Sequence, residues 1–166
     1  MKALVTLLLF AVSVSATAQT ADAIYQQACG PKDASFDVEQ VKGQPPAAPE
    51  PGKALVYFIQ KETDPVFITR IGLDGAWVGV IRHDAYIFAS VAPGEHHACA
   101  ASQDRKHPEA GAELLHFTVE AGKTYYYLVR GLTGATGYSM LFGAADRDEA
   151  LLLIASDPQS VAKTKP

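Results

Sequence analysis

Two adjacent histidines, His96 and His97, are the residues of this chain whose types most plainly suit metal chemistry. Imidazole nitrogens and carboxylates bind zinc, and Glu95 precedes the pair. Adjacent residues of a strand face opposite ways, so the two imidazoles cannot meet at one ion from a regular strand. The neighbours indicate a partly buried histidine at position 96, beside Ala98 and Ala100, and a surface histidine at position 97. We therefore predict no metal-binding residues and no cofactor.

One alternative stays open on the side of the strand that carries His97. A zinc site there would combine Glu95 and His97 with a third ligand, although no pair among the candidates has a recognised metal spacing. The third ligand would be one of the other histidines, His83, His107 or His116.

Groups for nucleophilic or phosphate chemistry lack a local signature. No serine lies in a Gly-x-Ser-x-Gly elbow. Asp74, Asp84 and Asp104 lie in predicted turns, where aspartate is favoured for its hydrogen bonds to the local backbone. The glycine-rich segment 131–137 resembles a phosphate loop, but no Lys-Ser/Thr follows it. We therefore predict no catalytic residues.

Three aromatic residues could form an exposed binding patch. Phe67, Trp77 and Tyr86 lie in or beside predicted strands, and such a patch would bind a sugar or a partner protein. Core packing is the alternative for all three, because large aromatic side chains are mostly buried.

The first residues predict export. Lys2 is followed by an apolar run, Ala3 to Val14, and Ala16-Thr17-Ala18 has the small-x-small pattern of a signal-peptidase site. The apolar run is too short to cross a bilayer as a helix. We expect residues 1–18 to be a signal peptide and the mature chain to be periplasmic or secreted, without stable membrane insertion.

The mature chain would keep two cysteines, Cys29 and Cys99. In an oxidising compartment an even pair in a small domain favours a disulfide. The alternative is a reactive thiol, but no neighbouring residue would activate either sulfur. We expect a Cys29–Cys99 disulfide, which would bring the N-terminal segment over the side of the strand that holds His97.

Composition excludes some partners. The net charge is −4, and the longest basic cluster is residues 105–107. Nucleic acids and anionic lipids both require clustered lysine and arginine. We therefore expect no nucleic-acid partner.

Turn signals at about ten-residue spacing predict an all-β fold. Asp74-Gly75, Pro93-Gly94 and Ala121-Gly122 each separate two apolar runs that are typical of strands. Seven to eight short strands indicate an antiparallel β-sandwich over residues 53–143. Residues 19–52 are expected to form an N-terminal segment, with helix at 21–28 and a proline-rich linker at 43–52. A short C-terminal helix at 150–155 and a loose tail from 159 complete residues 144–166.

Four segments in order resemble an uncharacterised bacterial family, the domain of unknown function 2846, whose members are secreted proteins and lipoproteins. The segments are Pro51 to Tyr57, Asp74 to Gly79, Pro93 to His96 and Glu120 to Tyr126. The resemblance implies a β-sandwich in the cell envelope and implies no reaction. The chain lacks the lipobox cysteine of the lipoprotein members.

These observations favour a non-enzymatic module that binds an envelope protein or a cell-wall component, or has a structural role there. Two alternatives remain. One is a small periplasmic hydrolase or metal-dependent enzyme that acts on envelope polymers, and the other is a secreted enzyme inhibitor.

Overall fold

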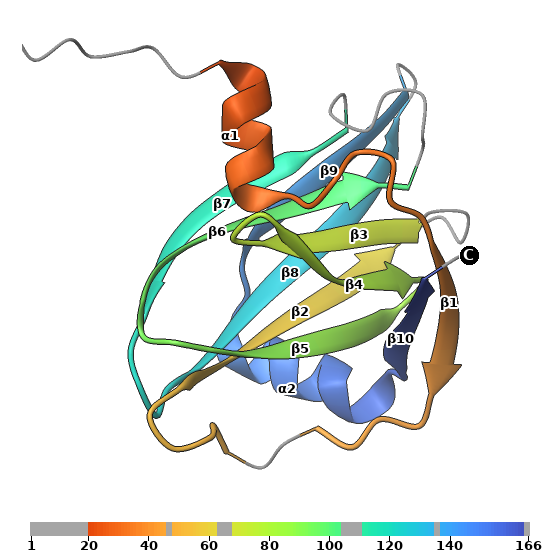
Figure 1. The fold of residues 1–166 in the computed structure, drawn as a ribbon. Helices are drawn as coiled ribbons and strands as arrows, with labels where there is room; N and C mark the ends of the chain where they lie inside the picture. The colour runs from red at the N-terminus through yellow and green to blue at the C-terminus, as the bar shows by residue number, and fades with distance from the viewer. Residues whose placement is uncertain (1–19, 46–47, 63–67, 104–110, 135–136, 165–166) are drawn as a thin grey trace, which may run out of the picture.

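The computed structural model describes residues 20–45, 48–62, 68–103, 111–134 and 137–164, which form ten strands and two helices (Figure 1). The predicted signal peptide and Phe67 lie outside these residues. The elements are α1 (Ala21–Ala28), β1 (Phe36–Val41), β2 (Ala54–Glu62), β3 (Ile68–Leu73), β4 (Ala76–Arg82), β5 (Ala85–Val91), β6 (Gly94–Ser102), β7 (Glu113–Val119), β8 (Thr124–Gly134), β9 (Gly137–Ala144), α2 (Arg147–Ser156) and β10 (Gln159–Thr164).

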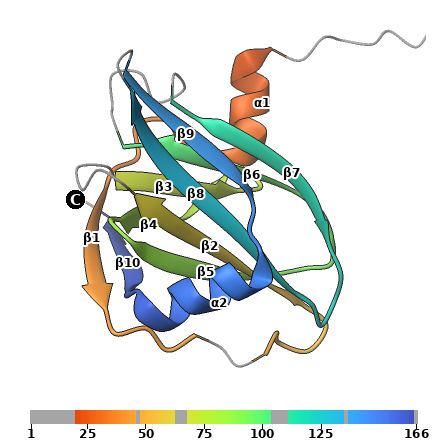
Figure 2. The ribbon, with the colours of Figure 1, turned by 180° about the vertical axis from the view of Figure 1, so that it is seen from behind.

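The strands form two sheets that face each other. Sheet A has six strands in the order β1-β10-β5-β2-β8-β9, and sheet B has four in the order β4-β3-β6-β7. At one side of the sandwich β4 contacts β5 and β10, and at the other side β7 contacts β9. Figures 1 and 2 show α1 against sheet B and α2 against the opposite, outer face of sheet A.

The predicted all-β sandwich is confirmed, but its sheets are not all antiparallel. Sheet B is antiparallel throughout, whereas sheet A is mixed. Strands β2 and β8 pair in parallel from Leu55 opposite Thr124 onward, and β10 pairs in parallel with β5. The antiparallel expectation was wrong here because turn signals report hairpins between neighbours, and no hairpin joins either parallel pair.

The hairpin predicted at Asp74-Gly75 is present. The two residues have φ values of 51° and 82°, the positive values that a tight I′ turn needs, and Leu73 pairs with Ala76 across it. The register that this turn sets holds as far as Gly72 opposite Trp77 and then shifts, so that Ile71 lies opposite Gly79.

The two sheets and two helices enclose three apolar clusters. The largest lies between the sheets and includes Phe58, Ile71 and Phe117. A second lies between sheet A and α2, and includes Tyr57 and Tyr86. The third lies between α1 and sheet B, around Cys29 and Cys99. Each helix therefore covers the outer face of one sheet.

The two ends of the chain extend the sandwich beyond its predicted bounds. Helix α1 has its predicted span. Helix α2 begins at Arg147, ahead of the predicted start, because the Asp146 carboxylate accepts hydrogen bonds from the N–H groups of Asp148 and Glu149. The tail predicted to be loose forms β10, which pairs with β1 along its whole length. Neither helix has the length and apolarity needed to span a membrane.

Candidate functional site

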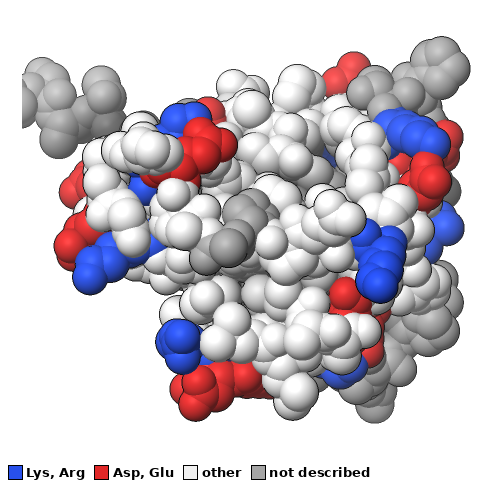
Figure 3. Space-filling view, turned by 90° about the horizontal axis from the view of Figure 1, so that it is seen from below, with Lys and Arg blue, Asp and Glu red and all other residues white. Residues whose placement is uncertain are grey.

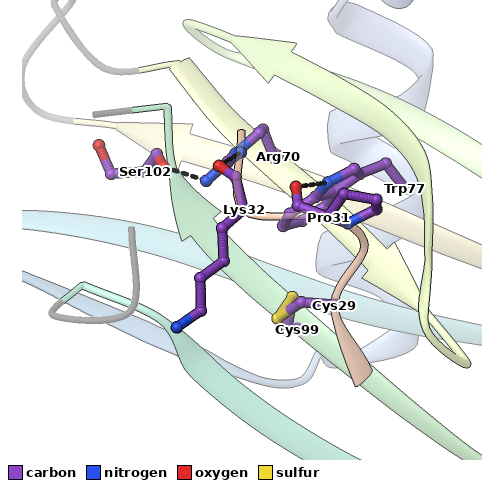
Figure 4. Close-up of a disulfide and its surroundings, with 7 residues drawn as sticks. All are labelled: Cys29, Pro31, Lys32, Arg70, Trp77, Cys99 and Ser102. Carbon is purple, nitrogen blue, oxygen red and sulfur yellow. Dashed lines mark hydrogen bonds between the residues drawn. A yellow bond between two sulfur atoms is a disulfide. The ribbon is translucent and has the colours of Figure 1, made fainter. Parts of the chain in front are cut away.

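The N-terminal arm, which we define as residues 20–35, is fixed to the outer face of sheet B. The predicted disulfide joins Cys29 to Cys99 of β6, and both residues are buried (Figure 4). Gly72 of β3 makes this approach possible, because a Cβ atom there would lie 2.7 Å from the Ala28 carbonyl oxygen and 2.9 Å from the Cys99 Sγ. Sheet B is therefore covered by its own N-terminal segment.

A buried arginine holds the same arm. Arg70 of β3 donates hydrogen bonds to the carbonyl oxygens of Lys32, Ala34 and Ser102. Its guanidinium lies 4.4 Å from the centre of the Trp77 ring, and the Trp77 indole donates to the Pro31 carbonyl (Figure 4). Burial lowers the pKa of Arg70. Carbonyl dipoles and an aromatic face together replace the water that this cation would otherwise bind.

The structure does not bring Trp77 and Tyr86 into one patch. Trp77 is half-buried in the cluster under the arm, whereas Tyr86 is fully buried in the cluster under α2. The two residues lie on opposite outer faces of the sandwich. The predicted patch is wrong for this pair because strands β4 and β5 belong to different sheets.

His96 and His97 face opposite ways, as predicted. His96 is buried and packs on Phe117, with its Nδ1 2.6 Å from an Asp74 carboxylate oxygen and its Nε2 2.8 Å from the Ala92 carbonyl. Burial opposes protonation, but hydrogen bonds with Asp74 and Ala92 outweigh it and raise the pKa of His96. Both ring nitrogens of His96 therefore have an oxygen partner within the fold.

His97 lies on the outer face of sheet B next to another histidine. Its ring stacks on that of His116 of β7, with centroids 4.7 Å apart. Glu95, a further residue of the zinc alternative, has a carboxylate oxygen 3.9 Å from His116 Nε2. As the side chains of the described residues lie, no three histidines, cysteines or carboxylates could hold one metal ion together.

A groove on the opposite side of the molecule was not predicted. We call it the α2 groove; it measures about 240 Å³. Its floor comes from the parallel pair β2 and β8, which places Leu55 beside Thr124 and Tyr57 beside Tyr126. Helix α2 and the proline-rich linker form its walls. The lining residues are Pro45, Leu55, Tyr57, Thr124, Tyr126, Leu151 and Ile154.

Tyrosine rings give the α2 groove its chemistry. Tyr57 and Tyr126 stack with centroids 5.6 Å apart and planes 17° from parallel. Burial raises the pKa of Tyr57 to about 12, and the neighbouring Tyr126 and Tyr86 contribute to this rise. The phenol therefore stays neutral at ordinary pH. The lining offers apolar surface and hydroxyl groups without charge.

The surroundings of the α2 groove combine apolar and charged residues. Leu152 of α2 is 69% exposed, and Leu151 beside it is 38% exposed. Ion pairs join Lys53, two residues before the groove residue Leu55, to Glu50, and join Arg130 to Glu149, two residues before the groove residue Leu151. Figure 3 shows the groove side of the molecule, with the charged side chains toward its margins and a largely uncharged middle.

No single motif in the sequence indicates this groove. Its walls come from β2, β8, α2 and the linker, which lie far apart along the chain. The available signal was the pair of apolar leucines, Leu151 and Leu152, in a helix that needs only one apolar face.

Comparison with known proteins adds little. The chain matches no protein-family model and no curated protein. It is similar to a protein from Eubacterium rectale solved by NMR, with a TM-score of 0.38 and 15% identity over 58% of this chain and 94% of that one. Similarity at this level supports no argument about function, so the resemblance to the domain of unknown function 2846 stays a prediction.

Proposed function

We propose that this chain is an exported, non-enzymatic β-sandwich module that binds another envelope protein through the α2 groove. The observation that carries the proposal is an uncharged, tyrosine-lined groove beside an exposed leucine. Export rests on the signal-peptide pattern, and the Cys29–Cys99 disulfide supports it because disulfides persist in oxidising compartments.

A protein partner suits the size of the groove. At about 240 Å³ it is smaller than most small-molecule sites, which span roughly 300–1,000 Å³. It has room for one large apolar side chain. Protein interfaces are commonly organised around such an anchor in a pocket, and tyrosine is enriched at their centres.

The residues around the α2 groove also suit a protein partner. An interface typically has an apolar middle and a polar rim. Leu152 and Leu151 extend the apolar surface beyond the groove, and the ion pairs Lys53–Glu50 and Arg130–Glu149 lie outside it. An exposed leucine at 69% is tolerated singly on any surface, but next to a groove it adds contact area for a partner.

A non-enzymatic role suits the lining of the groove. Its described residues are apolar side chains, two tyrosines and a threonine, without histidine, cysteine or a carboxylate. General acid–base or nucleophilic catalysis needs such groups within hydrogen-bond reach of a substrate.

Photo-crosslinking in cells that export the chain tests the proposal. A photoreactive phenylalanine analogue replaces Leu152, and in a control chain it replaces Leu114, an exposed leucine of β7. We expect the Leu152 position to yield an adduct of discrete mass with a second envelope protein, and the Leu114 position to yield none.

A second substitution ties that adduct to the groove. Leu151→Asp places a charge in the lining without touching the core of the sheets, and Leu114→Asp is the matched control. Leu151→Asp should abolish the adduct and Leu114→Asp should not. Equal adducts at both photoreactive positions, or none at either, would contradict the proposal.

A further inference from the structure

The outer face of sheet B carries a pair of histidines directly opposite each other on neighbouring strands. His97 of β6 pairs with His116 of β7, and the rings stack within 15° of parallel. Paired positions of an antiparallel ladder hold their Cβ atoms about 4.5–5.5 Å apart, close enough for two imidazoles to reach one ion. We propose that His97 and His116 form a binding site for a divalent transition-metal ion such as Zn²⁺.

The hydrogen bonding of the His97 ring suits a metal ligand. The side-chain nitrogen of Gln27 lies 2.9 Å from His97 Nε2. An amide NH₂ only donates, so this contact is a hydrogen bond in the tautomer whose Nε2 keeps its electron pair. A neutral imidazole with a free electron pair on one nitrogen is the form that binds zinc. The ion would take the place of the Gln27 amide at this nitrogen.

Nearby carboxylates favour a cation at this position. Glu95 has an oxygen 3.9 Å from His116 Nε2, and its side chain is 75% exposed. Asp74 accepts the backbone N–H of His97 through its other carboxylate oxygen. The charge of Asp74 is paired with His96, so Glu95 is the carboxylate that places negative charge beside the stacked rings, where it attracts a divalent ion.

The rings need only a small adjustment. Zinc binds histidine nitrogen at about 2.0–2.1 Å, so two ligating nitrogens lie at most about 4 Å apart. The ring centroids are 4.7 Å apart and the rings are nearly parallel, so binding would require a rotation about χ2 that turns one nitrogen of each ring toward a shared point. His116 has room for this, since its side chain is 54% exposed. With these two protein ligands, water molecules would fill the remaining coordination positions of the ion.

This site is separate from the α2 groove. It lies on the outer face of sheet B, next to α1, and the groove lies on the outer face of sheet A, next to α2. Either proposal stands or fails alone.

Calorimetric titration of the exported chain with Zn²⁺ tests the site, using protein that carries no affinity tag. We expect saturable binding of one ion per chain. His97→Ala and His116→Ala should each abolish it, while the circular-dichroism spectrum without metal stays that of the parent. His83→Asn is the matched control, because His83 directly follows β4, which does not pair with β6 or β7, and asparagine tolerates its φ of 55°.

Two further readouts separate metal ligation from a structural role. In NMR spectra of the histidine rings, Zn²⁺ should shift the nitrogens of His97 and His116 and leave those of His96 unchanged. Gln27→Ala removes the competing donor and should retain or tighten binding, and lower pH should weaken binding because protons compete for the same nitrogens. Absence of saturable binding, or binding unchanged in both alanine variants, would overturn the proposal.

Discussion

At the scale of single residues, the pair of Asp74 and His96 links a turn to the core. Asp74 occupies the left-handed position of the β3–β4 turn, and its carboxylate reaches both the ring of His96 and the backbone N–H of His97. The pair therefore ties the β3–β4 hairpin to β6. His96 is 8% exposed, which makes the hydrogen bonds of its ring important for stability.

This pair gives sheet B a pH-dependent stability. A histidine whose pKa is raised by folding stabilises the fold fully below its unfolded pKa of 6.5, and the contribution is lost as pH rises through the folded value. The difference in free energy of unfolding between the parent and His96→Gln should therefore shrink as pH rises from about 5 to about 9. Denaturant titrations across that range measure it. A difference that grows with pH would contradict the assignment, and Asp74→Asn should show the same trend as His96→Gln.

At the scale of elements, the contact between the arm and sheet B depends on a missing side chain. Gly72 pairs with both Trp77 and Cys99 in sheet B, and its Cα faces the end of α1. The disulfide, the Arg70 hydrogen bonds and the Trp77 indole all act within this contact. A methyl group at position 72 would press on backbone atoms, which cannot rotate away.

Gly72→Ala should therefore loosen the arm. Overpacking of this kind costs typically about 1–3 kcal/mol, so we expect a loss of that size in the free energy of unfolding. Faster hydrogen exchange in residues 20–35 should accompany it. Gly143→Ala in β9 is the control, because a Cβ atom there meets nothing within 4 Å. Equal effects of the two substitutions would contradict the proposed packing.

The elements also show what the sequence could predict. Turn residues such as Asp74-Gly75 predict hairpins, and the alternation of His96 and His97 predicts which face of the strand each side chain occupies. Both signals act over a few residues, so they could be recognised in the sequence. The continuous apolar run of β2 indicates burial on both faces but does not indicate which strands lie beside it, so its parallel pairing with β8 has no local signal. The α2 groove depends on that pairing and on how α2 docks, so it could not be predicted. The sequence QSVAKT of β10 is polar and mostly exposed, and its pairing with β1 makes it a strand.

At the scale of the whole molecule, β10 connects β1 to the rest of sheet A. It lies between β1 and β5, and it contacts β4 of the other sheet. Without it, β1 would lose its pairing partner in sheet A and the edge of β5 would be open to other chains.

Removal of residues 158–166 should thus destabilise the entire sandwich. We expect the midpoint of thermal unfolding to fall by about 10 °C or more, which corresponds to roughly 3 kcal/mol in a domain of this size. The shortened chain should also self-associate through β5, as size-exclusion chromatography would reveal. A chain that ends after Thr164 keeps β10 and is the control. An unchanged midpoint in the shorter chain would show that β10 is dispensable.

The position of β10 has a consequence for the order of events during biosynthesis. Its register joins Phe36 to Thr164, so sheet A cannot be completed until nearly all of these residues have left the ribosome. Contacts between segments so distant along a chain form slowly. A nascent chain with this topology therefore stays unfolded for longer than a chain whose strands all pair with their neighbours in hairpins. If the chain is exported as proposed, secretion machinery that threads extended polypeptides would receive it still unfolded, and the thiols of Cys29 and Cys99 would meet only after translocation.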